Sequence, residues 1–121
     1  MNLKLTHQQL QSIINKLLVR INKLDFVIIP TIKNKRFMQE YMLNKTRAKE
    51  LVLSKISQEN FVSYEFDRDL NNYGVGYVMI FIYDCELKNY SNQMRKIQIY
   101  VKIKDVDDSL PVLSMHESKG E

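Results

Sequence analysis

The chain of 121 residues contains no tryptophan, one cysteine, three glycines and two prolines. The single cysteine, Cys85, excludes an intramolecular disulfide and a cysteine-based zinc site. Three glycines are too few to build a phosphate-cradling loop, and neither the Walker pattern nor the dinucleotide fingerprint occurs, so no cofactor motif is present. No apolar run approaches the ~20 residues that span a bilayer, and the first residues form no apolar signal region. We therefore expect a cytoplasmic globular protein without a membrane segment, built as one domain over residues 1–121.

Charge is unevenly distributed along the chain, which has a net charge of +4. Residues 1–60 carry 11 Lys and Arg against 4 Asp and Glu, whereas residues 61–121 carry 7 against 10. The basic balance permits attraction to nucleic acid, but many small lysine-rich proteins bind none.

The first half of the chain has helical periodicity. Apolar residues recur every three to four positions over 6–24, and Thr6 with Gln9 forms a capping-box pattern at the start of this segment. Residues 25–30 are a brief strand or an extended connection. Asn34 is expected to cap a short helix ending at Met42, and Asn44 or Thr46 to cap the next one. Ser57 is expected to cap a single turn that follows.

From residue 61 onward the period changes to two. Strands are predicted at 61–66, 76–85, 95–104 and 111–117, separated by turn-forming residues. Helices followed by a meander predict an α+β fold, with the helices packed on one face of an antiparallel sheet of about four strands over 61–117.

The third strand is the most informative. Its odd-numbered residues, from Ile97 to Ile103, are apolar and are assigned to the core. The alternate set points the other way and contains Lys96, Gln98, Tyr100, Lys102 and Lys104. Such a face suits a phosphodiester backbone with a base stacked on it, although lysine and glutamine are also common on a solvated strand face.

The last strand adds a histidine. With Leu113 and Met115 in the core, Val112, Ser114 and His116 occupy the opposite face. If the last two strands form a hairpin through the acidic turn 105–108, His116 shares a face with Lys96, Tyr100 and Lys102. Histidine acts as a general acid or base near neutral pH, and a neighbouring lysine stabilises charge on a phosphate. The alternative is an exposed surface imidazole.

In the second strand, Val78, Ile80 and Ile82 are assigned to the core, and Tyr77, Met79, Phe81, Tyr83 and Cys85 to the other face. Tyr83 would stack on a base or donate a proton, or else pack as a core tyrosine.

A group of cations lies around the expected junction of the second and third helices. It comprises Lys33, Lys35, Arg36, Lys45, Arg47 and Lys49. These residues would hold a phosphate backbone or an acidic partner, or simply form a solvated surface.

Glu86 and Lys88 resemble the Glu-x-Lys of metal-dependent nucleases, with Asp67 or Asp84 as a further ligand. This pattern is common by chance, and a solvated turn also explains it.

Several motifs occur in the order seen in one family of small bacterial proteins. They lie at 37–41, 48–53, 60–62, 67–69, 99–104 (Ile-Tyr-Val-Lys-Ile-Lys) and 112–117 (Val-Leu-Ser-Met-His-Glu). Together they resemble the MqsR-like toxins within the RelE superfamily of mRNA interferases, across roughly residues 27–117.

The resemblance implies a RelE-like fold, metal-independent cleavage of single-stranded mRNA through attack by the 2′-hydroxyl, and a neutralising antitoxin. It places Tyr83 at a functional tyrosine and His116 at a late lysine. The family's upstream lysine falls at Ser63 here, so either Lys96 or Lys102 supplies that charge or the activity is lost.

The resulting hypothesis is a toxin-like endoribonuclease. Its candidate catalytic residues are His116, Lys96, Lys102, Tyr83 and Tyr100, and its candidate RNA-binding residues are Lys33, Lys35, Arg36, Arg47 and Lys104. The alternative is a non-catalytic inhibitor, encoded by a phage or mobile element, that binds a protein or RNA partner through the same fold.

Overall fold

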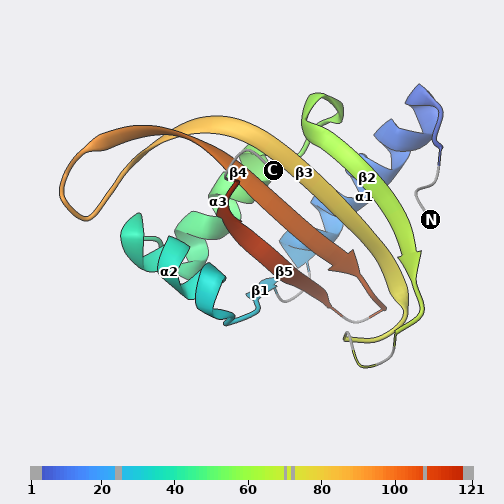
Figure 1. Cartoon of the computed structure of the whole chain (residues 1–121). Helices are drawn as coiled ribbons and strands as arrows, with labels where there is room; N and C mark the ends of the chain where they lie inside the picture. Colours follow the sequence, from blue (N-terminus) through green and yellow to red (C-terminus); the bar gives the residue numbers. More distant parts are fainter. Residues whose placement is uncertain (1–3, 24–25, 70, 72, 108, 119–121) are drawn as a thin grey trace.

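The computed structural model describes residues 4–23, 26–69, 71, 73–107 and 109–118. Three helices precede a long meander, and the strands form one five-stranded mixed sheet in the order β1-β5-β4-β3-β2 (Figure 1). The elements are α1 (His7–Lys23), β1 (Phe26–Ile28), α2 (Ile32–Glu40), α3 (Lys45–Lys55), the 3-10 turn η1 (Gln58–Asn60), β2 (Phe61–Asp67), β3 (Gly76–Lys88), β4 (Met94–Asp105) and β5 (Leu110–Glu117). The predicted α+β class is confirmed, with a fifth strand added by β1.

Helix α1 begins as its capping box predicts. The Thr6 backbone N–H donates to Gln9 Oε1 at 2.9 Å, and the Gln9 N–H donates to Thr6 Oγ1 at 3.1 Å. These two bonds satisfy backbone donors that the first helical turn leaves without partners. The apolar side of the helix then buries Ile14, Leu17 and Ile21 against the sheet.

The next two helices begin at different kinds of residue. Asn44 caps α3 as predicted, since its side chain accepts from the Arg47 N–H at 2.7 Å. The prediction that Asn34 caps α2 is wrong: Thr31 is the cap and accepts from the Asn34 N–H at 3.1 Å. Asn34 therefore lies inside the first turn, where it is buried.

The four strands predicted by two-fold periodicity are all present and pair antiparallel, as expected for a meander. The unforeseen feature is the parallel pairing of β1 with β5, in the register Phe26 to Leu110 through Ile28 to Val112. Parallel pairing joins segments more than 80 positions apart, and no local pattern indicates it.

Strand β5 contains a bulge that changes the side of one residue. Val112 pairs with Ile103 and Ser114 with Lys102, so Leu113 is the extra residue. The assignment of Leu113 to the core and Val112 to the opposite face is therefore wrong, since Val112 is fully buried in the core. A bulge shifts the alternation of every residue that precedes it on the strand.

The buried Asn34 side chain satisfies the backbone beside this bulge. Its amide nitrogen donates to Ile29 O at 2.8 Å and to Leu113 O at 3.1 Å, and its oxygen accepts from the Met115 N–H at 2.9 Å. Strand β1 ends beside Val112. Beyond that point, the Asn34 side chain makes the hydrogen bonds to β5 that a neighbouring strand would otherwise make.

In β3, the residues predicted to face the core and those predicted to face away from it are exchanged. Met79, Phe81 and Tyr83 are buried on the side of the helices, and Tyr83 pairs with the core residue Ile99. Ile82 lies on the other side and pairs with Tyr100. The assignment was wrong because both sets of β3 residues are largely apolar, so periodicity does not distinguish them.

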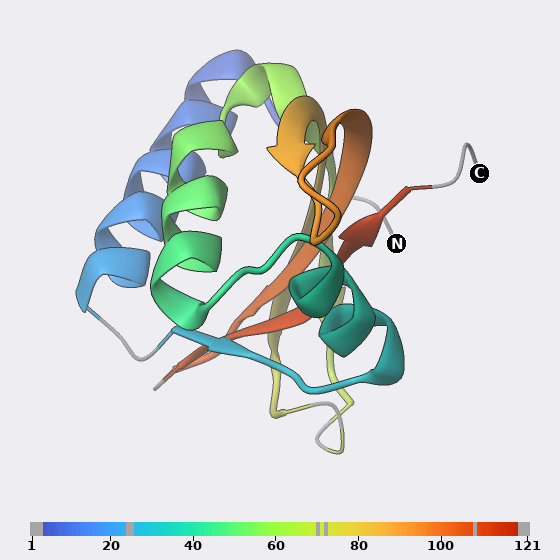
Figure 2. The same cartoon turned by 90° about the vertical axis from the view of Figure 1, so that its left-hand side faces the viewer.

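The helices leave one face of the sheet uncovered. Helices α1 and α3 lie on one side of the sheet, and α2 lies beside β5 near its edge (Figure 2). We call the opposite side the helix-free face. Within the described residues, no helix is long and apolar enough to cross a membrane.

Candidate active site

His116 and Tyr100 lie side by side on the helix-free face. They are directly paired residues of β5 and β4, and their rings stack with centroids 5.4 Å apart and an interplanar angle of 16°. The antiparallel pairing of the last two strands, predicted as a hairpin through residues 105–108, is thus confirmed. Both side chains are half-buried, and each keeps part of its surface exposed.

The imidazole of His116 is held in one orientation. Its Nδ1 lies 3.1 Å from the carbonyl oxygen of Glu117. A carbonyl oxygen only accepts, so Nδ1 is the donor, and in the neutral ring Nε2 carries the lone pair. This arrangement equips Nε2 to take a proton from a hydroxyl and later return it to a leaving group.

A cation and a hydroxyl complete the cluster. Lys102 of β4 pairs with Ser114 of β5, one row along from the Tyr100–His116 pair. The cluster lines a shallow hollow of about 310 Å³, formed by Ile82, Tyr100, Lys102, Ser114, His116 and Ser118. The hollow therefore offers a base, a phenol and an ammonium group to one small polar group.

Tyr100 is adapted to donate rather than to ionise. Burial, and secondarily the negative charge of Glu65, raises the pKa of the Tyr100 phenol above its ordinary value. Its hydroxyl consequently remains protonated through the neutral range, where it can donate a hydrogen bond to a phosphate oxygen.

Lys96 shares the face but lies apart from the cluster. It is four residues before Tyr100 on the same strand, which is about 13 Å along β4. It is paired across the strands with Glu86 and lines a different hollow of about 490 Å³ together with Asp84 and Gln98. The structure thus brings Lys102, and not Lys96, beside His116 and Tyr100.

The prediction that Tyr83 joins this cluster is wrong. Tyr83 is 4% exposed on the helix-covered side of β3. Burial raises the pKa of its phenol, and the hydroxyl has no hydrogen-bond partner among the described residues. A side chain on the opposite side of the sheet cannot reach a group held beside His116.

Lys104 is also unavailable to RNA. Its side chain is fully buried, and Nζ lies 3.0 Å from Asp67 Oδ2. The prediction of an exposed lysine is wrong because Asp67, at the end of β2, and the backbone oxygen of Asp69 close over this end of the face.

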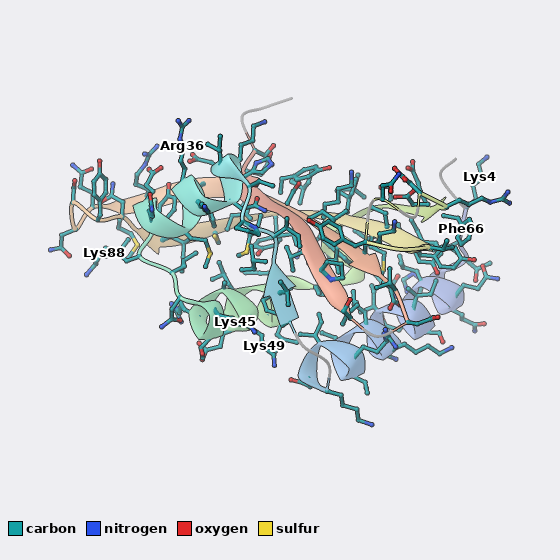
Figure 3. The ribbon with its side chains drawn as sticks, turned by 90° about the horizontal axis from the view of Figure 1, so that it is seen from below. Lys4, Arg36, Lys45, Lys49, Phe66 and Lys88 are labelled. Carbon is teal, nitrogen blue, oxygen red and sulfur yellow. The ribbon has the colours of Figure 1, made fainter. Side chains whose placement is uncertain are left out.

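Cations of the second and third helices point in different directions. In Figure 3, Arg36 on α2 points away from Lys45 and Lys49 on α3. Arg47 forms an ion pair with Glu50 at 3.5 Å on the exposed surface of α3. The cations on α2 are Lys33, Lys35 and Arg36, all exposed. The helix that carries these three residues packs against β5, the strand that carries His116.

Of the residues proposed for a metal-dependent nuclease, Asp84 and Glu86 share the helix-free face of β3, but Asp67 does not join them. Asp67 lies at the opposite end of β3 from Glu86 and Lys88, paired with Gly76. Among the described residues, no group of three His, Cys, Asp or Glu side chains is placed to hold a metal ion.

Sequence reasoning missed two contributors to the hollow and the group that orients His116. Ile82 was assigned to the core, and nothing in the pattern singles out Ser118. The carbonyl of Glu117 is a backbone group, which residue identity does not reveal. Ser114, by contrast, was placed correctly on the face of His116.

No protein-family model, curated protein or solved structure matches this chain. The resemblance to MqsR-like toxins therefore rests on the sequence motifs.

Proposed function

We propose that this protein is a metal-independent endoribonuclease of the toxin type, with its active site at His116, Tyr100 and Lys102. The observation that supports it best is the stacked Tyr100–His116 pair beside Lys102 in one hollow of the helix-free face. The proposed occupant of the hollow is the scissile phosphate of a single-stranded RNA.

In the proposed reaction, His116 Nε2 takes the proton of a ribose 2′-hydroxyl as its oxygen attacks the adjacent phosphorus. The bond from phosphorus to the 5′-oxygen breaks, which leaves a 2′,3′-cyclic phosphate and a 5′-hydroxyl. Lys102 neutralises charge on the non-bridging oxygens, and Tyr100 donates a hydrogen bond to one of them. The proton that His116 has taken up returns to the leaving 5′-oxygen. Lys33 and Arg36, on the helix beside β5, would bind flanking phosphates.

The family resemblance implies a lysine at the position that Ser63 occupies in this chain. We propose that Lys102 supplies this positive charge instead. Ser63 pairs with Ile80, and Ile80 pairs with Lys102, so the three residues form one row across the helix-free face. Lys102, two strands from Ser63 in this row, lines the hollow beside His116.

The test is cleavage of a labelled single-stranded RNA by purified protein in the presence of EDTA. We expect His116→Ala to lower the rate by about 10²- to 10⁴-fold and Lys102→Ala by about 10²-fold. Lys96→Ala is the matched control, since it removes the same charge from the same strand face outside the hollow. A DNA strand of the same sequence, which has no 2′-hydroxyl to attack, should resist cleavage.

Folded His116→Ala protein that cleaves at the wild-type rate would refute the site. In bacteria, induced wild-type protein should arrest growth with loss of mRNA, and the His116→Ala variant should not. We further propose a cytoplasmic location and a neutralising antitoxin as the natural partner.

The second candidate is a non-catalytic binding protein. It is favoured by the mixed charge of the helix-free face, where Glu65, Asp84 and Glu86 accompany Lys96 and Lys102. Mixed charge suits a protein surface at least as well as a phosphate backbone. Intact RNA with wild-type protein, combined with capture of a partner that tolerates His116→Ala, would support this candidate.

A further inference from the structure

The two edges of the sheet differ in how they are closed. At one edge β1 has three residues, and past its end the Asn34 side chain bonds the backbone of β5. At the other edge β2 has seven residues. No described segment donates a backbone hydrogen bond to its outer side or accepts one from it. The edge formed by β2 therefore offers backbone groups to another strand.

Only part of β2 is regular. The register shifts between Phe61 and Ser63, and from Ser63 to Asp67 each residue pairs in sequence with β3. Five residues of regular strand extend about 17 Å, enough for a short extended segment to pair along them.

The side chains along this edge are not those that usually protect one. Val62 is 48% exposed and Phe66 41% exposed. The ring of Phe66 lies beside that of Tyr77, with the two ring centroids 5.1 Å apart. Natural edges are commonly protected by lysine, by proline or by a bulge; the regular part of β2, from Ser63 to Asp67, contains none of these.

Strand β2 carries two carboxylates and no cation in a chain that is basic overall. Glu65 lies on the helix-free face of β2, half-buried and without an ion-pair partner among the described residues. Asp67, at the end of β2, is paired with Lys104, so Glu65 is the carboxylate of this strand that is left for an incoming cation. A second copy pairing on this edge would place acidic strands side by side, which is unfavourable.

We propose that the outer edge of β2 binds an extended segment of a partner protein, which adds to the sheet as a sixth strand with alternating basic and apolar residues. The basic residues of this segment lie beside Glu65 on the helix-free face. The apolar residues lie beside Phe66 on the other face. This inference does not depend on the proposed ribonuclease activity.

The test uses a labelled nine-residue peptide in which lysine alternates with valine, titrated against the purified full-length chain. A control peptide carries glutamate in place of lysine. We expect saturable one-to-one binding of the basic peptide only. Glu65→Lys and Phe66→Ser should each weaken it about tenfold.

Matched variants separate the edge from general attraction. Glu86→Lys makes the same charge change on the same face but on β3, and Val19→Ser removes an exposed apolar side chain from α1. Both should leave the affinity within about twofold, because neither residue lies on β2 or on the part of β3 that pairs with it. Binding should also slow hydrogen exchange at backbone amides of residues 63–67.

Three results would overturn the proposal: no saturable binding, equal weakening by Glu65→Lys and Glu86→Lys, or binding that protects no amide of β2. A protein that doubles its mass with concentration, and loses this behaviour in Phe66→Ser, would show instead that a second copy occupies the edge.

Discussion

The two faces of the sheet have different compositions although they share the same strands. On the helix-covered side, β4 contributes Ile97, Ile99, Val101 and Ile103, all 5% exposed or less. On the helix-free side, the intervening residues of the same strand include Gln98, Tyr100 and Lys102, which remain accessible. The helix-covered side provides most of the burial, and the helix-free side carries His116, Tyr100 and Lys102.

Neighbouring residues therefore have separate roles. Ile99 is fully buried, and the adjacent Tyr100 stacks on His116 at the hollow. Because successive side chains of a strand point to opposite faces, substitutions one position apart should affect either stability or activity. The following variants test this division, from the largest expected effect to the smallest.

The largest loss of stability is expected on the helix-covered side. Phe81 is fully buried at the centre of the core and contacts Phe61, with ring centroids 6.0 Å apart. Phe81→Ala should lower the free energy of unfolding by about 3–5 kcal/mol, because it removes a large buried ring and leaves a cavity. The exposed Gln98→Ala should change it by no more than about 0.5 kcal/mol. Urea denaturation followed by circular dichroism measures both, and equal losses would contradict the division.

The next prediction compares two lysines of β4 on the helix-free face. Lys104 is fully buried against Asp67, whereas Lys102 is half-buried and lines the hollow. Lys104→Ala should lower the free energy of unfolding by about 2–4 kcal/mol, since it removes buried packing and one partner of an ion pair. Lys102→Ala should leave stability within about 0.5 kcal/mol while it lowers RNA cleavage. Thermal and urea unfolding, measured beside the cleavage assay, compare the two variants. A stable Lys104→Ala protein would show that this end of the face is open.

Alkaline pH should weaken the side that the helices cover. Burial, aided by Glu117 and Glu40, raises the pKa of Tyr41 to about 12, and burial raises that of Tyr64 to about 12. Unfolded tyrosine loses its proton near pH 10, so the unfolded chain releases protons first as the pH rises. The stabilisation is therefore complete below pH 10 and is lost as the pH approaches 12.

Urea unfolding at pH 8, 10 and 11 should show this decline, and phenolate absorbance should report when the tyrosines ionise. Tyr41→Phe and Tyr64→Phe should each reduce the slope. A free energy of unfolding that stays constant from pH 8 to pH 11 would contradict the assignment.

Local signals in the sequence predicted much of this fold. The Thr6–Gln9 capping box and the Asn44 cap depend on residues three positions apart, and both are present. Two-fold periodicity located the four long strands, and the turn between the last two brought His116 to Tyr100. These features are predictable because their partners are close in sequence or fixed by a hairpin.

The errors arose where partners are distant or where both faces are apolar. Lys104 is buried by Asp67, 37 positions away. Asn34 bonds Leu113, 79 positions away, at a bulge that no pattern indicates. In β3 the two alternating sets are both apolar, so the sequence did not determine which set meets the helices, and Tyr83 was assigned to the wrong face.

Tyr83 provides the smallest and most selective test of the two faces. Its hydroxyl is buried without a described hydrogen-bond partner, and burial raises its pKa. Tyr83→Phe removes only that oxygen, so the free energy of unfolding should stay the same or rise by up to about 1 kcal/mol. RNA cleavage should be unchanged, because the side chain lies on the side of the sheet away from His116. Tyr100→Phe makes the same chemical change at the hollow and should slow cleavage by about 10-fold or more. If Tyr83→Phe slowed cleavage as much as Tyr100→Phe, the active site would extend through the sheet, and the division between the faces would fail.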